Sequence, residues 1–107
     1  MKREPTAFES RVYAVITTIP RGKVSTYALV AKHLHCGSSQ AIGQALKRNP
    51  FAPEVPCHRV VSSSLTLGGF NGQREGAELR RKRSLLDEEG VCFDENGAVE
   101  RESVFEF

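Results

Sequence analysis

The residues best suited to do chemistry stand together in segment 55–61, VPCHRVV. Cys57 offers a nucleophilic sulfur, and the imidazole of His58 and the fixed positive charge of Arg59 follow it directly. A thiol attacks as the thiolate, and neighbouring positive charge lowers the pKa of a cysteine from its free value of about 8.5. Pro56 fixes its own φ at about −65° and disfavours helix in the residue before it. The segment therefore indicates a rigid, electropositive setting for a reactive thiol.

A second interpretation of Cys57 stays open on these residues alone. Many cysteines are buried and inert, and side chains adjacent in sequence need not face one another. Cys57 would then be a small apolar side chain in a turn bounded by proline.

Three helices are predicted ahead of this segment. Apolar residues recur at helical spacing over 8–19, and Pro20 ends that helix. A second helix is expected over about 27–35 and a third over roughly 39–48, joined by a tight turn that contains Gly37. This pair matches the helix-turn-helix pattern. Side chains suited to N-capping precede the pair, at Ser25 or Thr26 and at Ser38 or Ser39.

The third helix carries small residues at Ala41, Gly43 and Ala45. Small side chains let a helix lie close to a second surface, either another helix or a nucleic-acid groove. The sequence leaves both alternatives open.

Beyond the cysteine segment we expect a short strand over 65–67, a glycine-rich loop over 68–72 and a helix over about 75–89. Residues 91–99 predict a β hairpin around an Asn-Gly turn. The predicted fold class is therefore mainly α: a single winged-helix or helix-turn-helix-like domain with a short β hairpin near the C-terminus.

Composition restricts the class of protein. The chain has 107 residues, 39% of them hydrophobic and 26% charged, typical of one soluble globular domain. The formal charge of +2 identifies no partner, although the basic run 80–83 permits nucleic-acid binding. There is no apolar run of about 18 residues and no signal-peptide pattern, so no membrane partner is expected. Three cysteines without a secretion signal indicate a reducing compartment, the cytoplasm or a eukaryotic nucleus.

Several motifs, taken in order, resemble the active-site domain of the O6-alkylguanine-DNA alkyltransferases. They are GKVSTY at 22–27, AIGQAL at 41–46, NP at 49–50, PCHRV at 56–60, and LL at 85–86 leading to EG at 89–90. The resemblance covers roughly residues 6–93. Members of this family repair DNA by moving an alkyl group irreversibly from guanine to their own cysteine, without a cofactor. The resemblance thus favours the reactive-thiol interpretation.

The resemblance also implies roles for individual residues. Cys57 would accept the alkyl group, His58 would take its proton through a water, and Glu89 would orient the imidazole. Tyr27 would donate a proton toward N3 of the departing guanine, and Asn49 would brace the turn that holds the cysteine. From the residues alone, Glu89 could equally be a solvated helix end, Tyr27 a core tyrosine and Asn49 a helix C-cap.

The implied partner is double-stranded DNA containing O6-alkylguanine, bound through the minor groove by a monomer, with other repair proteins as further candidates. The target base lies inside the duplex and must be rotated out. The expected DNA contacts are Thr26, Tyr27, Ser39, Gln40, Ala41, Gly43, Arg59 and Ser63. The expected guanine pocket includes Val60, Phe70, Asn71 and Gly72.

Three features depart from the family pattern. The family's N-terminal domain is absent, so residues 1–107 are expected to form one active-site domain, and the zinc that some members bind there is not implied. Gln40 stands where the family has an arginine that fills the space of the extruded base, which predicts weaker base flipping. The stretch after Gly72 is longer than expected and adds basic residues that could contact phosphate or form a solvated helix face: Arg74, Arg80, Arg81, Lys82 and Arg83.

No metal site is expected. His33, His35 and Cys36 lie close together but lack a second ligand pair at zinc-site spacing. Cys36 and Cys92 are interpreted as ordinary small apolar residues.

Two rival functions are alternatives to alkyl transfer. A non-catalytic alkyltransferase-like sensor would hold the lesion and recruit another repair pathway, but such proteins carry a different residue at the position of Cys57. An ordinary helix-turn-helix regulator would leave the cysteine segment and the glycine loop unexplained.

Overall fold

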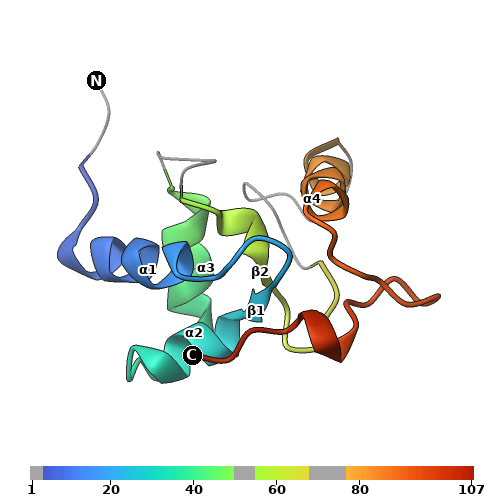
Figure 1. Cartoon of the computed structure of the whole chain (residues 1–107). Coiled ribbons are helices and arrows are strands. Elements are labelled where there is room, and N and C mark those ends of the chain that lie inside the picture. The colour runs from blue at the N-terminus through green and yellow to red at the C-terminus, as the bar shows by residue number, and fades with distance from the viewer. Residues whose placement is uncertain (1–3, 50–54, 68–76) are drawn as a thin grey trace.

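The computed structural model describes residues 4–49, 55–67 and 77–107. Within these ranges four α-helices surround one pair of two-residue parallel strands (Figure 1). The prediction of a mainly helical domain of the helix-turn-helix type is confirmed. None of the described helices combines the length and apolar character that crossing a lipid bilayer requires.

Helix α1 (Ala7–Thr17) begins at a reciprocal capping box. Glu9 donates its backbone N–H to the Thr6 hydroxyl at 3.1 Å, and the Glu9 carboxylate accepts the Thr6 N–H at 3.0 Å. The apolar stripe buries Val12 and Ile16 completely. The structure confirms this helix and its stop before Pro20.

Helices α2 (Tyr27–His33) and α3 (Ser39–Lys47) form the predicted helix-turn-helix pair. Thr26 caps α2 and Ser38 caps α3, because each hydroxyl accepts a backbone N–H from the first turn of its helix. The connection turns through His35, whose φ is 55°. The α2 helix ends at His33, two residues before the predicted boundary at 35.

Strands β1 (Ser25–Thr26) and β2 (Val60–Val61) pair in parallel, with Ser25 opposite Val60 and Thr26 opposite Val61. The strand predicted over 65–67 is wrong. The chain turns there, because Ser62 N–H donates to the Thr66 carbonyl at 3.0 Å and Leu65 has a φ of 67°. The Ser62 hydroxyl also bonds Thr66, which favours a turn over a strand.

The C-terminal third begins with helix α4 (Ala77–Glu88), followed by Gly90 at a φ of 87°. The predicted hairpin is confirmed: Phe93 pairs antiparallel with Val99, and the turn has Gly97 at a φ of 82°. The last residues return to the sheet, where Val24 forms a parallel bridge with Val104. A short 3₁₀ helix, η2 (Arg101–Ser103), precedes that bridge.

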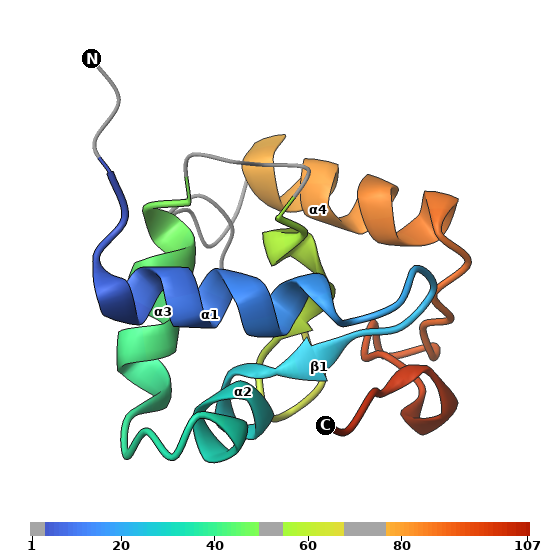
Figure 2. The same cartoon turned by 60° about the vertical axis from the view of Figure 1, so that its left-hand side comes forward.

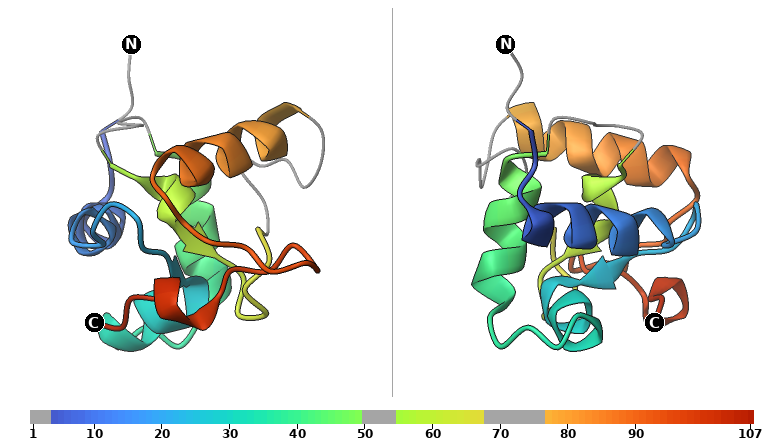
Figure 3. Two further views of the ribbon diagram at one scale, coloured as in Figure 1. Left: turned by 45° about the vertical axis from the view of Figure 1, so that its right-hand side comes forward. Right: turned by 90° about the vertical axis from the view of Figure 1, so that its left-hand side faces the viewer.

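A second 3₁₀ helix, η1 (Cys57–Arg59), occupies the middle of the fold. Helix α1 crosses α3 on one side (Figure 2), and the buried Tyr13 hydroxyl donates to the Ala45 carbonyl at 2.7 Å, which joins the two helices. Helix α4 packs on η1 at the end of the molecule away from α2 (Figure 3). The larger core cluster includes Cys57 and Val60, so the cysteine segment is part of the packed interior.

Candidate active site

Cys57 is the first residue of η1 and is only 6% exposed. A tight turn carries it, in which the Cys57 N–H donates to the Val55 carbonyl at 2.9 Å. The Asn49 side-chain amide donates to the same carbonyl at 3.0 Å. The Asn49 backbone N–H donates to the Leu46 carbonyl at 3.1 Å. The Asn49 side chain therefore bonds the turn that carries Cys57, whereas the C-cap of α3 is Arg48, so the alternative of Asn49 as the C-cap is wrong by one residue.

His58 and Glu89, distant in the chain, meet at hydrogen-bonding distance. His58 Nε2 lies 2.8 Å from Glu89 Oε2, and both side chains are more than nine-tenths buried. An ionised carboxylate only accepts hydrogen bonds, which assigns the proton to Nε2 of the imidazole. The lone pair of Nδ1 is then left to act as a base.

Arg59 holds Glu89 from the other side. Its Nε donates to Oε1 and its Nη2 to Oε2, each at 2.8 Å, and its Nη1 donates to the Ile19 carbonyl at 2.9 Å. Burial alone raises the pKa of Glu89, but hydrogen bonds from Arg59 and His58 outweigh it and lower that pKa to about 2. The carboxylate is thus ionised at neutral pH. Arg59, expected to contact DNA, has its guanidinium directed into this buried network.

A glycine turn places the end of α4 beside η1. A β-carbon on Gly22 would lie 3.1 Å from the Glu89 carbonyl, and Gly22 has a φ of 88°, so this position requires glycine on both counts. The neighbouring Arg21 donates to the Glu88 carbonyl at 3.1 Å. The turn after α1 therefore contacts the end of α4 and helps to position Glu89 beside His58.

Burial is the largest influence on the pKa values of Cys57 and His58. It raises the pKa of the Cys57 thiol, against smaller opposing effects from the Asn49 hydrogen bond and the charges of Lys82 and Arg81. It lowers the pKa of His58, although Glu89 acts in the opposite direction. The sequence predicted a cysteine pKa lowered by its neighbours; the structure gives the reverse because the sulfur is desolvated. The resting pair is a neutral thiol beside a neutral imidazole.

Comparison with known proteins identifies this arrangement. A family model described as the DNA-binding domain of 6-O-methylguanine DNA methyltransferase matches residues 7–91. The chain belongs to this family. It is 46% identical over 87 residues to a methylated-DNA–protein-cysteine methyltransferase of Thermococcus sibiricus, a match covering 80% of this chain and 46% of that protein. The chain thus spans about half the length of the curated relatives it matches.

Solved structures similar to this chain include complexes with DNA. Mycobacterium tuberculosis OGT in complex with DNA aligns with a TM-score of 0.67 at 36% identity, covering 81% of this chain and 52% of that one. S. pombe Atl1 in complex with damaged DNA containing O6-carboxymethylguanine aligns with a TM-score of 0.79 at 29% identity, covering 98% of this chain and 100% of Atl1.

The helix-turn-helix residues of this methyltransferase-family domain lie around the two helix starts. Tyr27 is the first residue of α2 and half-buried against the larger core cluster. Ser39 and Gln40 are exposed at the start of α3. Half-buried Ala41 and Gly43 follow on the same helix.

The small residues of α3 divide between the two alternatives that the sequence leaves open: Ala45 is buried in the larger core cluster, whereas Gly43 is only half-buried. A β-carbon built there meets no described atom within 4 Å. Helix-on-helix packing within the described residues therefore gives no reason for glycine at this position. The open space suits the close approach of a partner.

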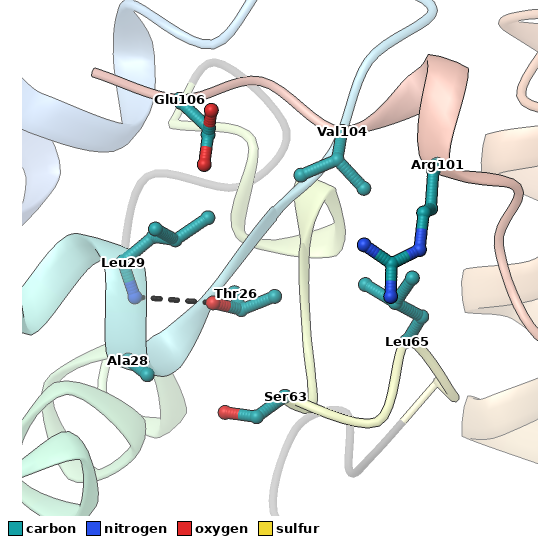
Figure 4. Close-up of a pocket in the computed structure, with 8 residues that line it drawn as sticks. All are labelled: Thr26, Ala28, Leu29, Ser63, Leu65, Arg101, Val104 and Glu106. Atoms are coloured by element: carbon teal, nitrogen blue, oxygen red, sulfur yellow. Dashed lines mark hydrogen bonds between the residues drawn. The ribbon is translucent and has the colours of Figure 1, made fainter.

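A pocket of about 420 Å³ lies beside the expected DNA contacts Thr26 and Ser63 (Figure 4). Its other lining residues come from α2, the 62–66 turn and the C-terminal segment: Ala28, Leu29, Leu65, Arg101, Val104 and Glu106. Cys57 does not line it. Figure 4 shows Arg101 and Glu106 on opposite sides, so the pocket carries charges of both signs.

Part of the expected guanine pocket lies outside the described residues, namely Phe70, Asn71 and Gly72, as does the basic residue Arg74. Val60, the remaining expected pocket residue, is fully buried in β2. The residues considered and set aside as metal ligands have other contacts. His33 stacks on Phe107 with ring centroids 4.9 Å apart, and Cys36 Sγ donates to the Ser38 carbonyl at 3.4 Å.

Sequence reasoning missed the most unusual side chain near the site. The basic run predicts a phosphate contact or a solvated helix face for Lys82, but this side chain is 0% exposed. Its Nζ donates to the Val60 carbonyl at 2.8 Å and to the Leu67 carbonyl at 2.5 Å. Its neighbours Arg80 and Arg81 are exposed, so only its place on the helix face distinguishes it.

Proposed function

We propose that this chain repairs DNA by transferring an alkyl group, such as methyl, irreversibly from O6-alkylguanine to Cys57. The observation that carries the proposal is the chain of contacts from Arg59 through Glu89 to His58, which adjoins the sulfur in sequence. This arrangement supplies a neutral base whose tautomer is fixed by a buried carboxylate. Nucleophile, base and orienting group are the parts that covalent catalysis by a cysteine requires.

The proposed reaction consumes one protein molecule for each lesion. The Cys57 proton passes through a water to Nδ1 of His58, and the resulting thiolate attacks the alkyl carbon. The sulfur–carbon bond forms as the bond from carbon to guanine O6 breaks. Tyr27 donates a proton to N3 of the departing guanine, which offsets the negative charge on the leaving group. The His58 imidazolium gives up its proton to solvent, the Tyr27 phenolate regains one, and the proton on N3 exchanges to N1, which leaves a thioether on Cys57 and an intact guanine.

DNA binding is assigned to the starts of α2 and α3, with the minor groove as the proposed site. The open space above Gly43 permits close approach of a sugar–phosphate backbone. The minor groove carries little sequence information, which suits a protein that must examine every guanine. Gln40 is the proposed residue beside the extruded base, and Thr26, Ser39 and Ser63 are proposed backbone contacts. Guanine would be bound against Val60 and segment 70–72.

The protein is proposed to act as a monomer in the cytoplasm or, in a eukaryote, the nucleus. The thiols Cys36, Cys57 and Cys92 are all free, which suits a reducing compartment. Mechanistically, transfer of this kind draws on one sulfur in one chain, so no second subunit and no cofactor enters the proposal.

A second candidate function is lesion binding without transfer, followed by recruitment of another repair protein. The likeness to S. pombe Atl1 over 98% of this chain favours it. Cys57 with its adjoining base favours transfer, because a sensor needs no nucleophile.

The experiment that distinguishes alkyl transfer from lesion binding measures how much O6-methylguanine remains in the DNA. A duplex with one O6-methylguanine is incubated with increasing amounts of protein and digested to nucleosides for chromatography. Transfer predicts that guanine replaces O6-methylguanine in proportion to the protein added and stops at one lesion per molecule. A lesion that stays bound and unchanged would establish the sensor.

A further inference from the structure

Lys82 is a buried titratable group that the proposed reaction does not use. It is the largest fully buried side chain in the described part of the protein, although lysine is almost never fully buried without a partner. Burying an ammonium is costly unless hydrogen bonds compensate it. The burial of the Lys82 ammonium therefore calls for a structural or functional explanation.

The contacts of Lys82 connect three segments around the cysteine. The side chain leaves α4 and donates to the carbonyl of Val60 in β2, three residues after Cys57. It donates as well to the carbonyl of Leu67, beyond the 62–66 turn. Helix α4 packs directly on η1, the short helix that Cys57 begins (Figure 3). One ammonium therefore ties the strand that follows the sulfur to the helix that ends at the catalytic carboxylate.

The charge of Lys82 also reaches the sulfur. Burial lowers the pKa of Lys82 to about 8, while the Cys57 charge acts to raise it, so the ammonium is protonated at neutral pH. In the reverse direction, Lys82 lowers the pKa of Cys57 and also that of His58. The other charges that bear on the sulfur or the imidazole in the described residues are Arg81, Arg59 and Glu89. Arg59 and Glu89 carry opposite charges and pair with each other, and Arg81 is exposed, so Lys82 is the fully buried cation among these groups.

We propose that Lys82 is a positioning residue for alkyl transfer: its buried ammonium fixes β2 and the 62–66 turn against α4 and presents a positive charge to the Cys57 thiolate. The inference rests on the proposed function for its biological meaning, since a resting thiol in a desolvated site needs a nearby charge to ionise. Lys82 supplies that charge without contacting the substrate.

The test measures the ionisation of Cys57 without DNA, so that it is independent of the repair reaction. Cys36 and Cys92 are first replaced by serine, and the rate of Cys57 alkylation by iodoacetamide is followed from pH 6 to 10. Lys82→Met removes the charge and the donor at similar length. Arg80→Met, on an exposed position of the same helix, is the matched control.

The expected result is that Lys82→Met raises the pH midpoint of Cys57 alkylation by about one unit and slows alkylation at pH 7 about tenfold. With lesion DNA it slows single-turnover transfer at saturation by a similar factor and leaves affinity for undamaged DNA unchanged. Arg80→Met leaves the midpoint in place. A folded Lys82→Met protein with the parental midpoint would overturn the proposal. If parental protein alkylates normally with iodoacetamide but transfers no methyl group from DNA, the proposed function fails while this test still decides the role of Lys82.

A second measurement needs no change at Lys82, in case the methionine variant fails to fold. The titration of the Lys82 ammonium is followed by NMR before and after Cys57 is blocked as a neutral thioether with iodoacetamide. Because coupling between two sites is reciprocal, blocking the sulfur should lower the midpoint of Lys82 titration. An unchanged midpoint means that the two groups do not interact, which refutes the proposal.

Discussion

Arg59 donates two parallel hydrogen bonds to the Glu89 carboxylate, from Nε to Oε1 and from Nη2 to Oε2, each 2.8 Å long. The same Oε2 accepts the His58 imidazole. The carboxylate therefore cannot rotate without breaking a contact to one of its two partners. The orientation of the His58 imidazole therefore depends on Arg59 through the shared carboxylate of Glu89.

Replacing Arg59 with lysine should weaken both stability and transfer. A lysine is a point charge without the planar fork, so it cannot hold both carboxylate oxygens. We expect the free energy of unfolding, measured by urea denaturation, to fall by about 1–3 kcal/mol, since hydrogen bonds to charged groups are of that size. Single-turnover transfer should slow about tenfold as the imidazole loses its fixed orientation.

The matched control for this substitution is Arg48→Lys. Arg48 also pairs with a buried carboxylate, Glu9, but at 3.4 Å and with its own side chain 54% exposed. The loss there should stay under about 0.5 kcal/mol. Equal losses for the two variants would show that the bidentate geometry of Arg59 has no special weight.

Glu89 should make the protein sensitive to acid. Its pKa is lowered from 4.5 to about 2 in the folded state, so its stabilisation is fully present above about pH 4.5 and is lost as pH falls toward 2. The shift corresponds to about 3 kcal/mol. Denaturation between pH 7 and 2.5 should show this loss in the parent and not in Glu89→Gln. Glu88→Gln, on an exposed neighbour, should keep the parental slope.

His58 should set the lower pH limit of transfer. The base works only when neutral, and burial lowers its pKa from 6.5, so the rate should hold down to a pH below 6.5 and then fall. His58→Gln should slow transfer by about 10²-fold or more at pH 7, the usual contribution of a general base, and remove the acid limb. The readout is single-turnover rate against pH at saturating protein. A His58→Gln rate equal to that of the parent would exclude the imidazole as the base.

Replacing Gly43 with leucine should weaken DNA binding without lowering the stability of the fold. Leucine is the better helix former by about 0.8 kcal/mol, and a β-carbon meets no described atom within 4 Å, so Gly43→Leu should not destabilise the fold. The added side chain would fill the space assigned to the sugar–phosphate backbone and should weaken duplex binding at least tenfold, as measured by fluorescence anisotropy. Gln44→Leu, the next exposed position, controls for added apolar surface. Unimpaired duplex binding by Gly43→Leu would show that DNA binds to another face of the protein.

The helices of this fold could be predicted from sequence because their signals are local. Pro20, the capping residue Thr26 and Gly90 each mark a boundary within a few residues of the helix they end or begin. The hairpin at 91–99 is local in the same way. By contrast, the pairing of β1 with β2 joins residues far apart in the chain, and a two-residue strand leaves no periodic pattern to detect.

Part of the geometry of the candidate site could be anticipated from the sequence. The resemblance implies that Glu89 orients the His58 imidazole, and the two side chains lie 2.8 Å apart; the roles proposed for Cys57, His58 and Glu89 stay predictions. It could not show that Arg59 turns inward, since an arginine beside a reactive thiol suits DNA equally well. Lys82 was missed because a run of basic residues gives no sign of which one faces the interior.

Alkylation of Cys57 itself is the outcome that distinguishes transfer from lesion binding, and mass spectrometry of the protein measures it. The protein is incubated with a duplex containing O6-methylguanine and then mapped by peptide mass. We expect a gain of one methyl group on the peptide that holds Cys57, and no gain for Cys57→Ala, which still binds the lesion. An unchanged mass with tight lesion binding, or a methyl group on Cys36 or Cys92, would contradict it.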